Sequence, residues 1–188
     1  VWYTNNNGTS FTPILDSSPT QNVGSLAVDW KTKTIWVGTG EVNSSRSSYS
    51  GTGVYKSTDN GKNWQYLGLP ESHHIGKIVL HPTNATIAWV AVLGHLYSPN
   101  KERGVYKTTD GGKTWKEIDK GLPKLKGKMG IAISPANPKI VYMAIEALGE
   151  KGGVYRSDNA GESFVQTTND PTTYARAWYY MHIIADPT

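Results

Sequence analysis

The stretch Ser57-Thr58-Asp59-Asn60-Gly61-Lys62-Asn63-Trp64 decides the fold, because it recurs along the chain. A close copy occupies residues 108–115, and weaker copies occupy 157–164 and 4–11. Each copy reads hydroxyl, any residue, Asp or Asn, any residue, Gly, any residue, small polar residue, aromatic residue. The Asp or Asn side chain accepts backbone hydrogen bonds and closes a turn, and the Gly supplies a positive φ. Each copy therefore predicts a tight hairpin, and its aromatic residue begins the outgoing strand with a large apolar face to bury.

The four copies are evenly spaced. Their third positions lie 53, 51 and 49 residues apart, and self-similarity at a fixed period indicates a repeat architecture. We interpret the defining residues as turn-formers and not as catalytic groups. They are Asn6 and Gly8 in the first copy, Asp59, Gly61 and Trp64 in the second, Asp110, Gly112 and Trp115 in the third, and Asn159, Gly161 and Phe164 in the fourth.

This motif resembles the Asp-box, or bacterial neuraminidase repeat, found in β-propellers such as sialidases, xyloglucanase-type glycoside hydrolases and the sortilin ectodomain. The resemblance covers nearly the whole chain, and it is more specific for the fold than for the activity. The blocks 37–43, 103–115 and 176–180 look most like large bacterial Asp-box proteins related to sortilin and often labelled glycosyl hydrolases. The resemblance implies an all-β propeller of four-stranded antiparallel blades, here a partial propeller of about three to four blades.

The strand pattern divides the single propeller segment, residues 1–188, into blades. We expect residues 1–15 to form the outer strands of a preceding blade, 25–68, 76–119 and 129–167 to form three blades, and 178–188 to form the first strand of a following blade. One option is a four-bladed ring in which residues 1–14 pair with the C-terminal strand, and the other, which we prefer, is a slice of a larger propeller. Such a slice exposes strand edges and blade faces, so we expect it to pair with missing blades or a second copy.

Composition narrows the possible functions. The 188 residues suffice for one domain, and the absence of cysteine excludes disulfides and thiolate metal sites. A net charge of +4 is too small to indicate nucleic-acid binding, and no apolar run is long enough to span a membrane. The chain begins with Val1 and shows no signal peptide, so we expect a mature product or an excised piece of a longer protein. We expect an extracytoplasmic, bacterial protein without a cofactor.

Strand order assigns the loops to two faces. In a four-stranded meander the Asp-boxes share one side with the short Pro-containing turns, and the long loops lie opposite, where function usually resides. Glu41 and Glu146 end second strands near the expected central channel, and two facing carboxylates are the minimum for glycoside hydrolysis. Solvated strand-end residues are the alternative for both. The ligand-binding candidates on the same side are Asn43, Arg46, His95, Arg103, Arg176 and Trp178.

Three further functional interpretations of the sequence are disfavoured. A sialidase needs an arginine cluster for the substrate carboxylate, and only four arginines occur. His73, His74 and His95 do not have the spacing of a zinc site, so no metal site is predicted. The basic run formed by Lys120, Lys124, Lys126 and Lys128 is expected to be solvated.

Two functions remain. One is an extracytoplasmic propeller that acts as a scaffold and holds a glycan or a protein on the loop face. The alternative is a glycoside hydrolase, xyloglucanase-like rather than sialidase-like, with a carboxylate pair that includes Glu41. Because a cleft built from opposite sides of a ring needs the whole ring, we expect this chain alone to be inactive even if the complete protein is an enzyme.

Overall fold

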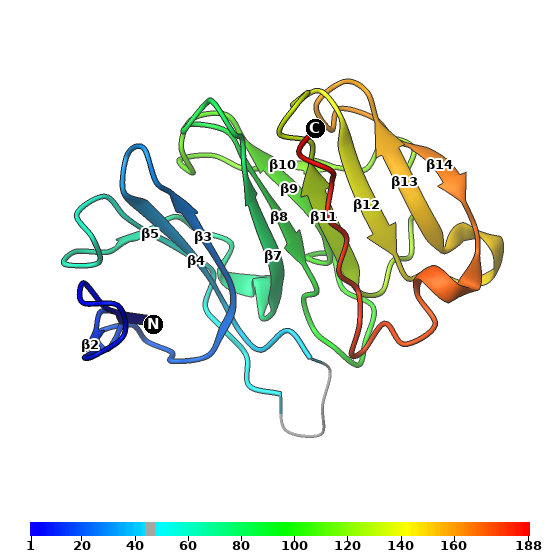
Figure 1. Ribbon diagram of the computed structural model, residues 1–188. Coiled ribbons are helices and arrows are strands. Elements are labelled where there is room, and N and C mark those ends of the chain that lie inside the picture. The colour runs from blue at the N-terminus through cyan, green and yellow to red at the C-terminus, as the bar shows by residue number, and fades with distance from the viewer. Residues whose placement is uncertain (44–47) are drawn as a thin grey trace.

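The computed structural model describes residues 1–43 and 48–188, and it is built from antiparallel β-sheets (Figure 1). A hairpin of β1 (Trp2–Tyr3) and β2 (Thr12–Pro13) forms a two-stranded sheet of its own. Three four-stranded sheets, here called blades 1 to 3, follow in chain order. Among the described residues the helical elements are three short 3₁₀ turns, η1 (Pro70–Ser72), η2 (Gly149–Lys151) and η3 (Pro171–Thr173). The predicted all-β partial propeller is confirmed.

Each blade is a simple meander in which every strand pairs with its neighbour in sequence. Blade 1 contains β3 (Val23–Asp29), β4 (Thr34–Thr39), β5 (Val54–Ser57) and β6 (Gln65–Tyr66). Blade 2 contains β7 (Ile75–Leu80), β8 (Ala88–Val92), β9 (Gly104–Thr108) and β10 (Lys116–Ile118). Blade 3 contains β11 (Met129–Ile133), β12 (Val141–Ile145), β13 (Gly153–Ser157) and β14 (Val165–Thr168).

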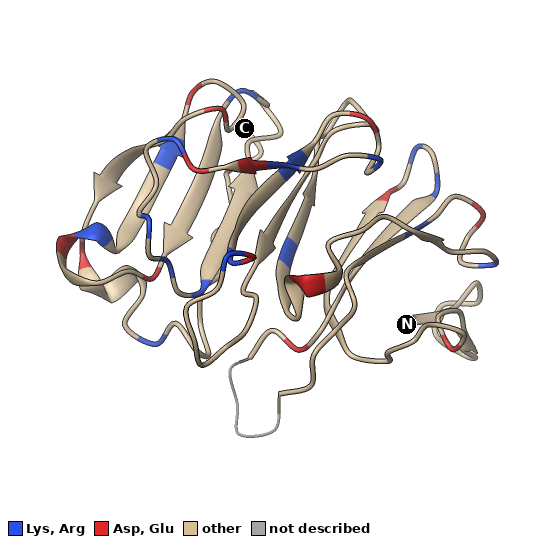
Figure 2. Ribbon diagram, turned by 180° about the vertical axis from the view of Figure 1, so that it is seen from behind, with Lys and Arg blue, Asp and Glu red and all other residues tan. Residues whose placement is uncertain are grey.

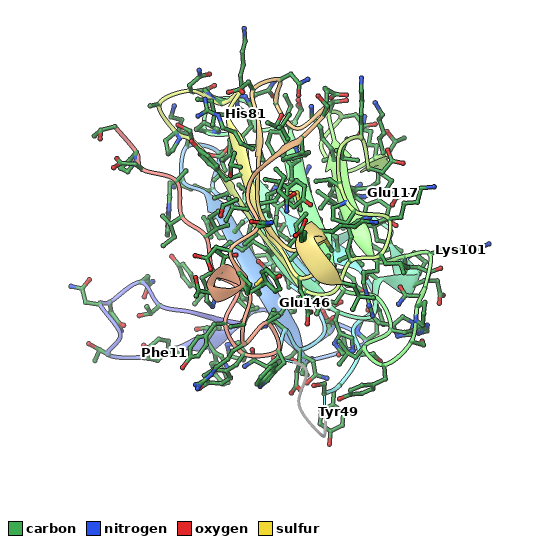
Figure 3. The ribbon with its side chains drawn as sticks, turned by 90° about the vertical axis from the view of Figure 1, so that its right-hand side faces the viewer. Phe11, Tyr49, His81, Lys101, Glu117 and Glu146 are labelled. Carbon is green, nitrogen blue, oxygen red and sulfur yellow. The ribbon has the colours of Figure 1, made fainter. Side chains whose placement is uncertain are left out.

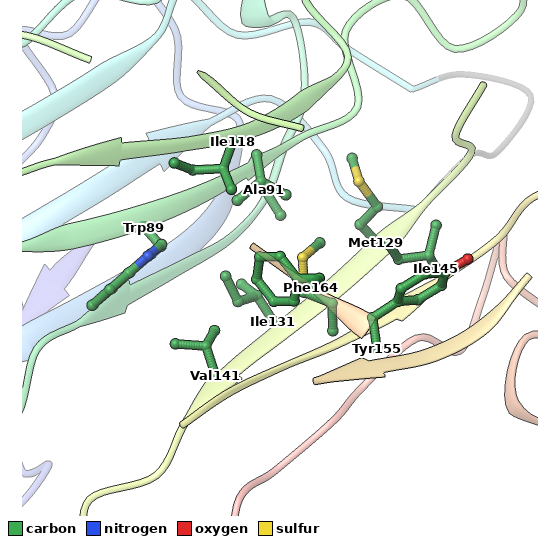
Figure 4. Close-up of a cluster of buried hydrophobic side chains, with 11 residues drawn as sticks. Trp89, Ala91, Ile118, Met129, Ile131, Val141, Ile145, Tyr155 and Phe164 are labelled. Carbon is green, nitrogen blue, oxygen red and sulfur yellow. The ribbon is translucent and has the colours of Figure 1, made fainter. Parts of the chain in front are cut away.

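The blades stack through hydrophobic clusters that lie between the sheets. The largest cluster joins blade 2 to blade 3, and it places Trp89 and Ile118 against Ile131, Tyr155 and Phe164 (Figure 4). The corresponding cluster between blades 1 and 2 packs the side chain of Trp36 among aliphatic residues of β7 and β8. Because both faces of β4 and β8 are covered, all their residues are buried, which explains why these strands read as continuous apolar runs.

The inner strands approach one another so closely that glycine is required at the contact. A Cβ atom on Gly24 of β3 would lie 2.3 Å from the carbonyl oxygen of Ile75 in β7. A Cβ on Gly130 of β11 would lie at the same distance from the carbonyl oxygen of Met181. Met181 therefore contacts the first strand of blade 3 in the same way that Ile75 of blade 2 contacts the first strand of blade 1. The C-terminal segment runs alongside β11 (Figure 1).

No strand is assigned to residues 178–188, all of which the structure describes. The placement of Met181 suits the first strand of a following blade, but no strand among the described residues pairs with this segment. That part of the expected division stays a prediction. The two-stranded sheet of β1 and β2 packs against blade 1 through Ile14 and Leu15 and does not pair with the C-terminal segment, so the four-bladed ring is not formed.

All four Asp-box turns close with one pattern of hydrogen bonds. In the second copy the Ser57 hydroxyl donates to Asp59 at 2.8 Å and accepts from the Gly61 N–H at 2.8 Å, while the Asp59 carboxylate accepts from the Asn63 N–H at 2.9 Å. The same three contacts recur at Thr4, Asn6, Gly8 and Ser10, at Thr108, Asp110, Gly112 and Thr114, and at Ser157, Asn159, Gly161 and Ser163.

The Asp-boxes also connect neighbouring blades. The indole of Trp64 donates to the carbonyl oxygen of Ile14, which lies in the preceding hairpin. The amine of Lys56 in blade 1 lies over the ring of Trp36 and donates to the carbonyl oxygen of Gly111, in the turn of blade 2. Because each contact joins two repeats, these turns stabilise the stacking of blades as well as the hairpins themselves.

The first Asp-box departs from the expectation for its aromatic residue. Phe11 is 57% exposed, whereas Phe164 in the fourth copy is 4% exposed. The physical reason is position, since among the described residues no further sheet lies beyond the β1–β2 hairpin to cover Phe11 (Figure 1).

Candidate functional site

The long loops gather on one face and the Asp-boxes on the other. The box turn of blade 2 lies beside the β7–β8 turn, since the Gly111 N–H donates to the carbonyl oxygen of Thr86 at 2.8 Å. On the opposite side the β4–β5 loop meets the connection between blades 1 and 2. There the Gly51 N–H donates to the carbonyl oxygen of His73 at 2.6 Å. Figure 3 shows this separation, with His81 at one end of the molecule and Tyr49 at the other.

A pocket with a volume of about 720 Å³ lies on the loop face, between the loops of blades 2 and 3. Its wall combines apolar and aromatic side chains with a few polar ones. The lining residues used below are Tyr97, Asn100, Arg103, Lys124, Lys126, Glu146 and Tyr174. Tyr97 comes from the β8–β9 loop and Tyr174 follows η3, so segments far apart in sequence build the pocket.

Arg103 organises the β8–β9 loop from inside. Its guanidinium donates to the carbonyl oxygen of Leu93 at 2.6 Å, to that of Lys126 at 3.3 Å and to that of Ser98 at 3.2 Å, with a further contact to the carbonyl of His95. Burial lowers the pKa of Arg103, and the nearby charge of Glu146 opposes that shift. Arg103 was predicted as a ligand-binding residue, and in this structure its donors are directed at the loop backbone.

Glu146 is the carboxylate of the pocket. It follows β12, is half-buried, and accepts a hydrogen bond of 2.9 Å from the backbone N–H of Lys128. It also lines a smaller pocket of about 180 Å³ together with Arg103 and Trp178. The structure therefore brings three of the predicted site residues, Glu146, Arg103 and Trp178, to one region.

Glu41 lies elsewhere. It follows β4 in blade 1, and its carboxylate accepts a hydrogen bond of 3.3 Å from the backbone N–H of Tyr49. Within the part of the chain that the structure describes, none of the four pockets is lined by both Glu41 and Glu146. The two carboxylates predicted as a catalytic pair are thus separated by blade 2.

The expectation that the basic run is solvated is wrong for two of its members. Lys126 is 9% exposed, and its amine donates to the carbonyl oxygen of Pro123 at 3.0 Å. Lys128 is 7% exposed, and its amine donates to the carbonyl oxygen of Trp178 at 3.4 Å. Burial lowers the pKa of both amines, although neighbouring carboxylates oppose the shift. The loop before β11 folds these stems inward, where their methylenes pack while the amines reach backbone oxygens.

The remaining predicted residues are scattered. Asn43 is exposed and lines a pocket of about 140 Å³ beside the inner strands. Arg176 is exposed in a turn, where its carbonyl oxygen accepts from the N–H groups of Tyr179 and Tyr180. Arg46 lies outside the described residues. Charged residues of both signs are spread over loops and strands in the view of Figure 2.

The histidines divide into two environments. His74 is buried, and its Nδ1 lies 2.8 Å from the carbonyl oxygen of Glu41. The ring of His73, the adjacent residue, lies against that of His95 at an angle of 38°, with centroids 3.8 Å apart. Glu71, which no sequence pattern singled out, reaches the same two rings.

Comparison with known proteins places this fold in a family. The family described as "Sortilin, neurotensin receptor 3" matches residues 1–128. The chain belongs to the sortilin (Vps10) family. A curated relative of this chain, the "Probable oligoxyloglucan-reducing end-specific xyloglucanase" of Neosartorya fischeri, is 32% identical over 142 residues. That match covers 68% of this chain but only 16% of the relative, so the chain spans a small part of its length.

Solved structures show the same propeller fold. The GH74 enzyme of Niastella koreensis superposes with a TM-score of 0.68 at 22% identity, covering 89% of this chain and 26% of that one. An ancestral GH74 enzyme superposes with a TM-score of 0.60 at 20% identity, covering 88% and 21%. The sortilin-family chain therefore corresponds to a segment of these larger proteins. None of the helices described here is long and apolar enough to cross a membrane.

Proposed function

We propose that this segment is a glycan-binding scaffold whose binding site is the pocket of about 720 Å³ between the loops of blades 2 and 3. The observation that carries the proposal is the make-up of the wall. Two tyrosines, Tyr97 and Tyr174, offer flat apolar faces on which sugar rings can stack, and Asn100, Lys124 and Glu146 offer groups for hydroxyls. A concave, mainly apolar site with a few polar groups is the usual form of a small-ligand site.

The carboxylate count favours binding over hydrolysis within this chain. Glycoside hydrolysis generally needs two carboxyl groups that flank the bond, and among the described residues Glu146 is the single carboxylate that lines this pocket. Glu41 lies in blade 1 and outside it. A hydrolytic pair would have to include a carboxylate from another part of a complete propeller.

A glycan array supplemented with xyloglucan oligosaccharides tests the proposal. The Tyr97→Ala variant should weaken binding roughly two- to tenfold, the range expected for loss of one stacked aromatic ring. Tyr97 is 79% exposed, so this change leaves the core intact. Tyr49→Ala is the matched control, because Tyr49 is 62% exposed on the same face but outside the pocket. Equal loss in both variants, or no binding by the unmodified chain, would contradict the assignment.

Glycoside hydrolysis by the complete protein is the second candidate, favoured by the name of the relative that is 32% identical. In that case Glu146 would act with a carboxylate from outside this chain, or Glu41 would act in a cleft that needs the missing blades. Turnover of xyloglucan by the full-length protein, lost in Glu146→Gln or Glu41→Gln, supports this candidate. Binding without turnover supports the scaffold.

We propose in addition that the segment pairs with further blades or with a second copy. Support comes from the two ends of the segment, where Phe11 is 57% exposed and Ile184 is 89% exposed. Light scattering that shows a monomer at high concentration would argue against pairing of two copies. A bacterial, extracytoplasmic origin stays a prediction from the family resemblance.

A further inference from the structure

Three metal-ligating side chains converge on the loop face, and none of them lines the proposed glycan pocket. Glu71 and His73 belong to the connection between blades 1 and 2, and His95 belongs to the β8–β9 loop. One ligand atom from each of the three lies within 4.8 Å of the other two. The carboxylate of Glu71 is 3.6 Å from Nε2 of His73, and the rings of His73 and His95 are tilted by 38°.

Both loops hold their histidine by the backbone. The carbonyl oxygen of His73 accepts from the Gly51 N–H at 2.6 Å, and the residue has a left-handed φ of 49°. The carbonyl oxygen of His95 accepts from the amide of Asn100 at 3.0 Å and from the guanidinium of Arg103. A non-glycine residue with φ above zero is uncommon and needs such support from its surroundings. The two imidazoles are therefore placed by the fold and not by their own contact.

One polar atom of the cluster is unsatisfied. Nε2 of His73 is inaccessible to water and has no hydrogen-bond partner among the described residues. Leaving a buried polar atom without a partner costs free energy, and native structures usually offer a compensating ligand, water or ion. Here the atom faces the carboxylate of Glu71 across 3.6 Å, which is too long for a hydrogen bond.

We propose that Glu71, His73 and His95 form a binding site for a first-row transition-metal dication, with Zn²⁺ as the best match. Two imidazoles and one carboxylate suit this class, whereas Ca²⁺ and Mg²⁺ prefer oxygen ligands alone. Zinc binds imidazole nitrogen at about 2.0–2.1 Å, which places tetrahedral ligand atoms roughly 3.3 Å apart. The three ligand atoms now lie at most 4.8 Å from one another. Shortening these distances by up to about 1.5 Å would bring the atoms to the separation that zinc requires.

The site has three protein ligands and so leaves a fourth position to water or to a ligand on the loop face. This proposal is independent of the glycan pocket, because none of its three ligands lines that pocket. The sequence spacing did not predict it, since the ligands come from separate loops and the acidic member precedes His73 by only two residues.

Isothermal titration of the 188-residue chain with ZnCl₂ tests the site. We expect one equivalent of Zn²⁺ to bind, with a matching increase in the melting temperature. Co²⁺ used as a probe should give the visible absorption of a four-coordinate ion. His73→Gln, His95→Gln and Glu71→Gln should each weaken binding at least tenfold, as expected when one of three ligands is removed.

His182→Gln is the matched control, because His182 is exposed within the C-terminal segment and distant in sequence from the cluster. Its Zn²⁺ affinity should equal that of the unmodified chain. Because Glu71 is exposed, Glu71→Gln keeps the fold, and its circular dichroism and melting temperature without metal should match those of the parent. Absence of Zn²⁺ binding, or equal binding by His73→Gln and the parent, would overturn the proposal.

Discussion

The indole Nε1 of Trp115 donates a hydrogen bond of 2.8 Å to the carbonyl oxygen of Leu67. Trp115 closes the Asp-box of blade 2, and Leu67 follows the outer strand of blade 1, so one side chain joins two repeats. Trp64 makes the equivalent bond to Ile14, one repeat earlier. In the fourth copy Phe164 has no N–H on its ring and contributes packing instead.

Replacing Trp115 with Phe should therefore separate hydrogen bonding from packing. Loss of the indole N–H leaves the carbonyl oxygen of Leu67 without this donor, and we expect the free energy of unfolding to fall by about 1–2 kcal/mol. Urea denaturation measures the change. Trp30→Phe is the control, because Trp30 is 83% exposed and its loss should cost less than about 0.5 kcal/mol. Equal costs in the two variants would show that the bond between blades contributes nothing.

A buried amine should stabilise the contact between blades 2 and 3. Lys107 donates to the carbonyl oxygen of Ala160 at 2.9 Å and to the carboxylate of Glu162 at 2.7 Å, and its side chain is 9% exposed. Lys107→Met should cost about 1–3 kcal/mol, because it removes a charged donor and leaves the carbonyl oxygen of Ala160 without it, although Glu162 keeps its ion pair with Lys116.

Arg156 supplies the comparison for Lys107. It occupies the corresponding position of blade 3, pairs with Asp158 within its own hairpin, and has a side chain that is 41% exposed. Arg156→Met should lower the free energy of unfolding much less than Lys107→Met does, as exposed ion pairs contribute little. A larger loss for Arg156→Met than for Lys107→Met would contradict the inter-blade role of Lys107.

The Asp-box carboxylates should make the fold sensitive to acid. Hydrogen bonds from Asn63 and Ser57 lower the pKa of Asp59 from 3.8 to about 2, and those from Thr114 and Thr108 lower the pKa of Asp110. The unfolded chain then binds more protons than the folded chain in this range, so stability falls as the pH is lowered. The contribution is complete above about pH 4, the unfolded pKa, and is lost as the pH falls through the folded pKa.

Asp110→Asn isolates this effect from the other carboxyl groups. Asn159 shows that an amide can close the same turn, because its Nδ2 donates to the Ser163 hydroxyl at 2.9 Å. We expect the difference in stability between the parent and the variant to shrink between pH 4 and pH 2, measured by urea denaturation at each pH. A difference that stays constant across this range would refute the assignment.

Ala160 is the one residue of the Asp-box turns whose type opposes its backbone conformation. Its φ is 57°, at the position that Gly111 occupies in blade 2 with φ 78°. Ala160→Gly should raise the free energy of unfolding by about 0.5–1 kcal/mol, because glycine removes the left-handed strain but adds freedom to the unfolded chain. Thermal or urea denaturation detects the gain.

Asn60→Gly provides the matched control for Ala160→Gly. Asn60 occupies the same turn position with φ 61°, and asparagine tolerates the left-handed region better than alanine does. Its gain should be smaller than that of Ala160→Gly. The strain argument fails if Ala160→Gly is neutral or destabilising.

The parts of this fold that depend on short stretches could be predicted from sequence. The Asp-box of 57–64 contains its own turn chemistry, so the Asp59 and Gly61 contacts lie within four residues of their partners. The evenly spaced copies then indicate successive sheets. The sequence pattern also predicted that the Asp-boxes and the long loops lie on opposite faces. In a meander the strands alternate in direction, so successive connections lie on alternate sides.

The candidate sites depend on packing between loops, which a local pattern does not contain. Glu71, His73 and His95 meet because the connection between blades 1 and 2 lies against the β8–β9 loop. Arg103 was predicted to bind a ligand and Lys126 to be solvated, yet both donate to backbone oxygens of neighbouring loops. Glu41 and Glu146 share a strand-end position in the pattern, but they belong to blades that are not adjacent.

The cation that lies over an aromatic ring recurs in each blade, as Lys56 on Trp36, Lys107 on Trp89 and Arg156 on Tyr142. In the first two cases the same amine also reaches the turn of the next repeat. A gene duplication that inserted one more repeat would thus encode both halves of its own junction. Such a scaffold can gain repeats in evolution without new kinds of contact between blades, while its loops diverge independently.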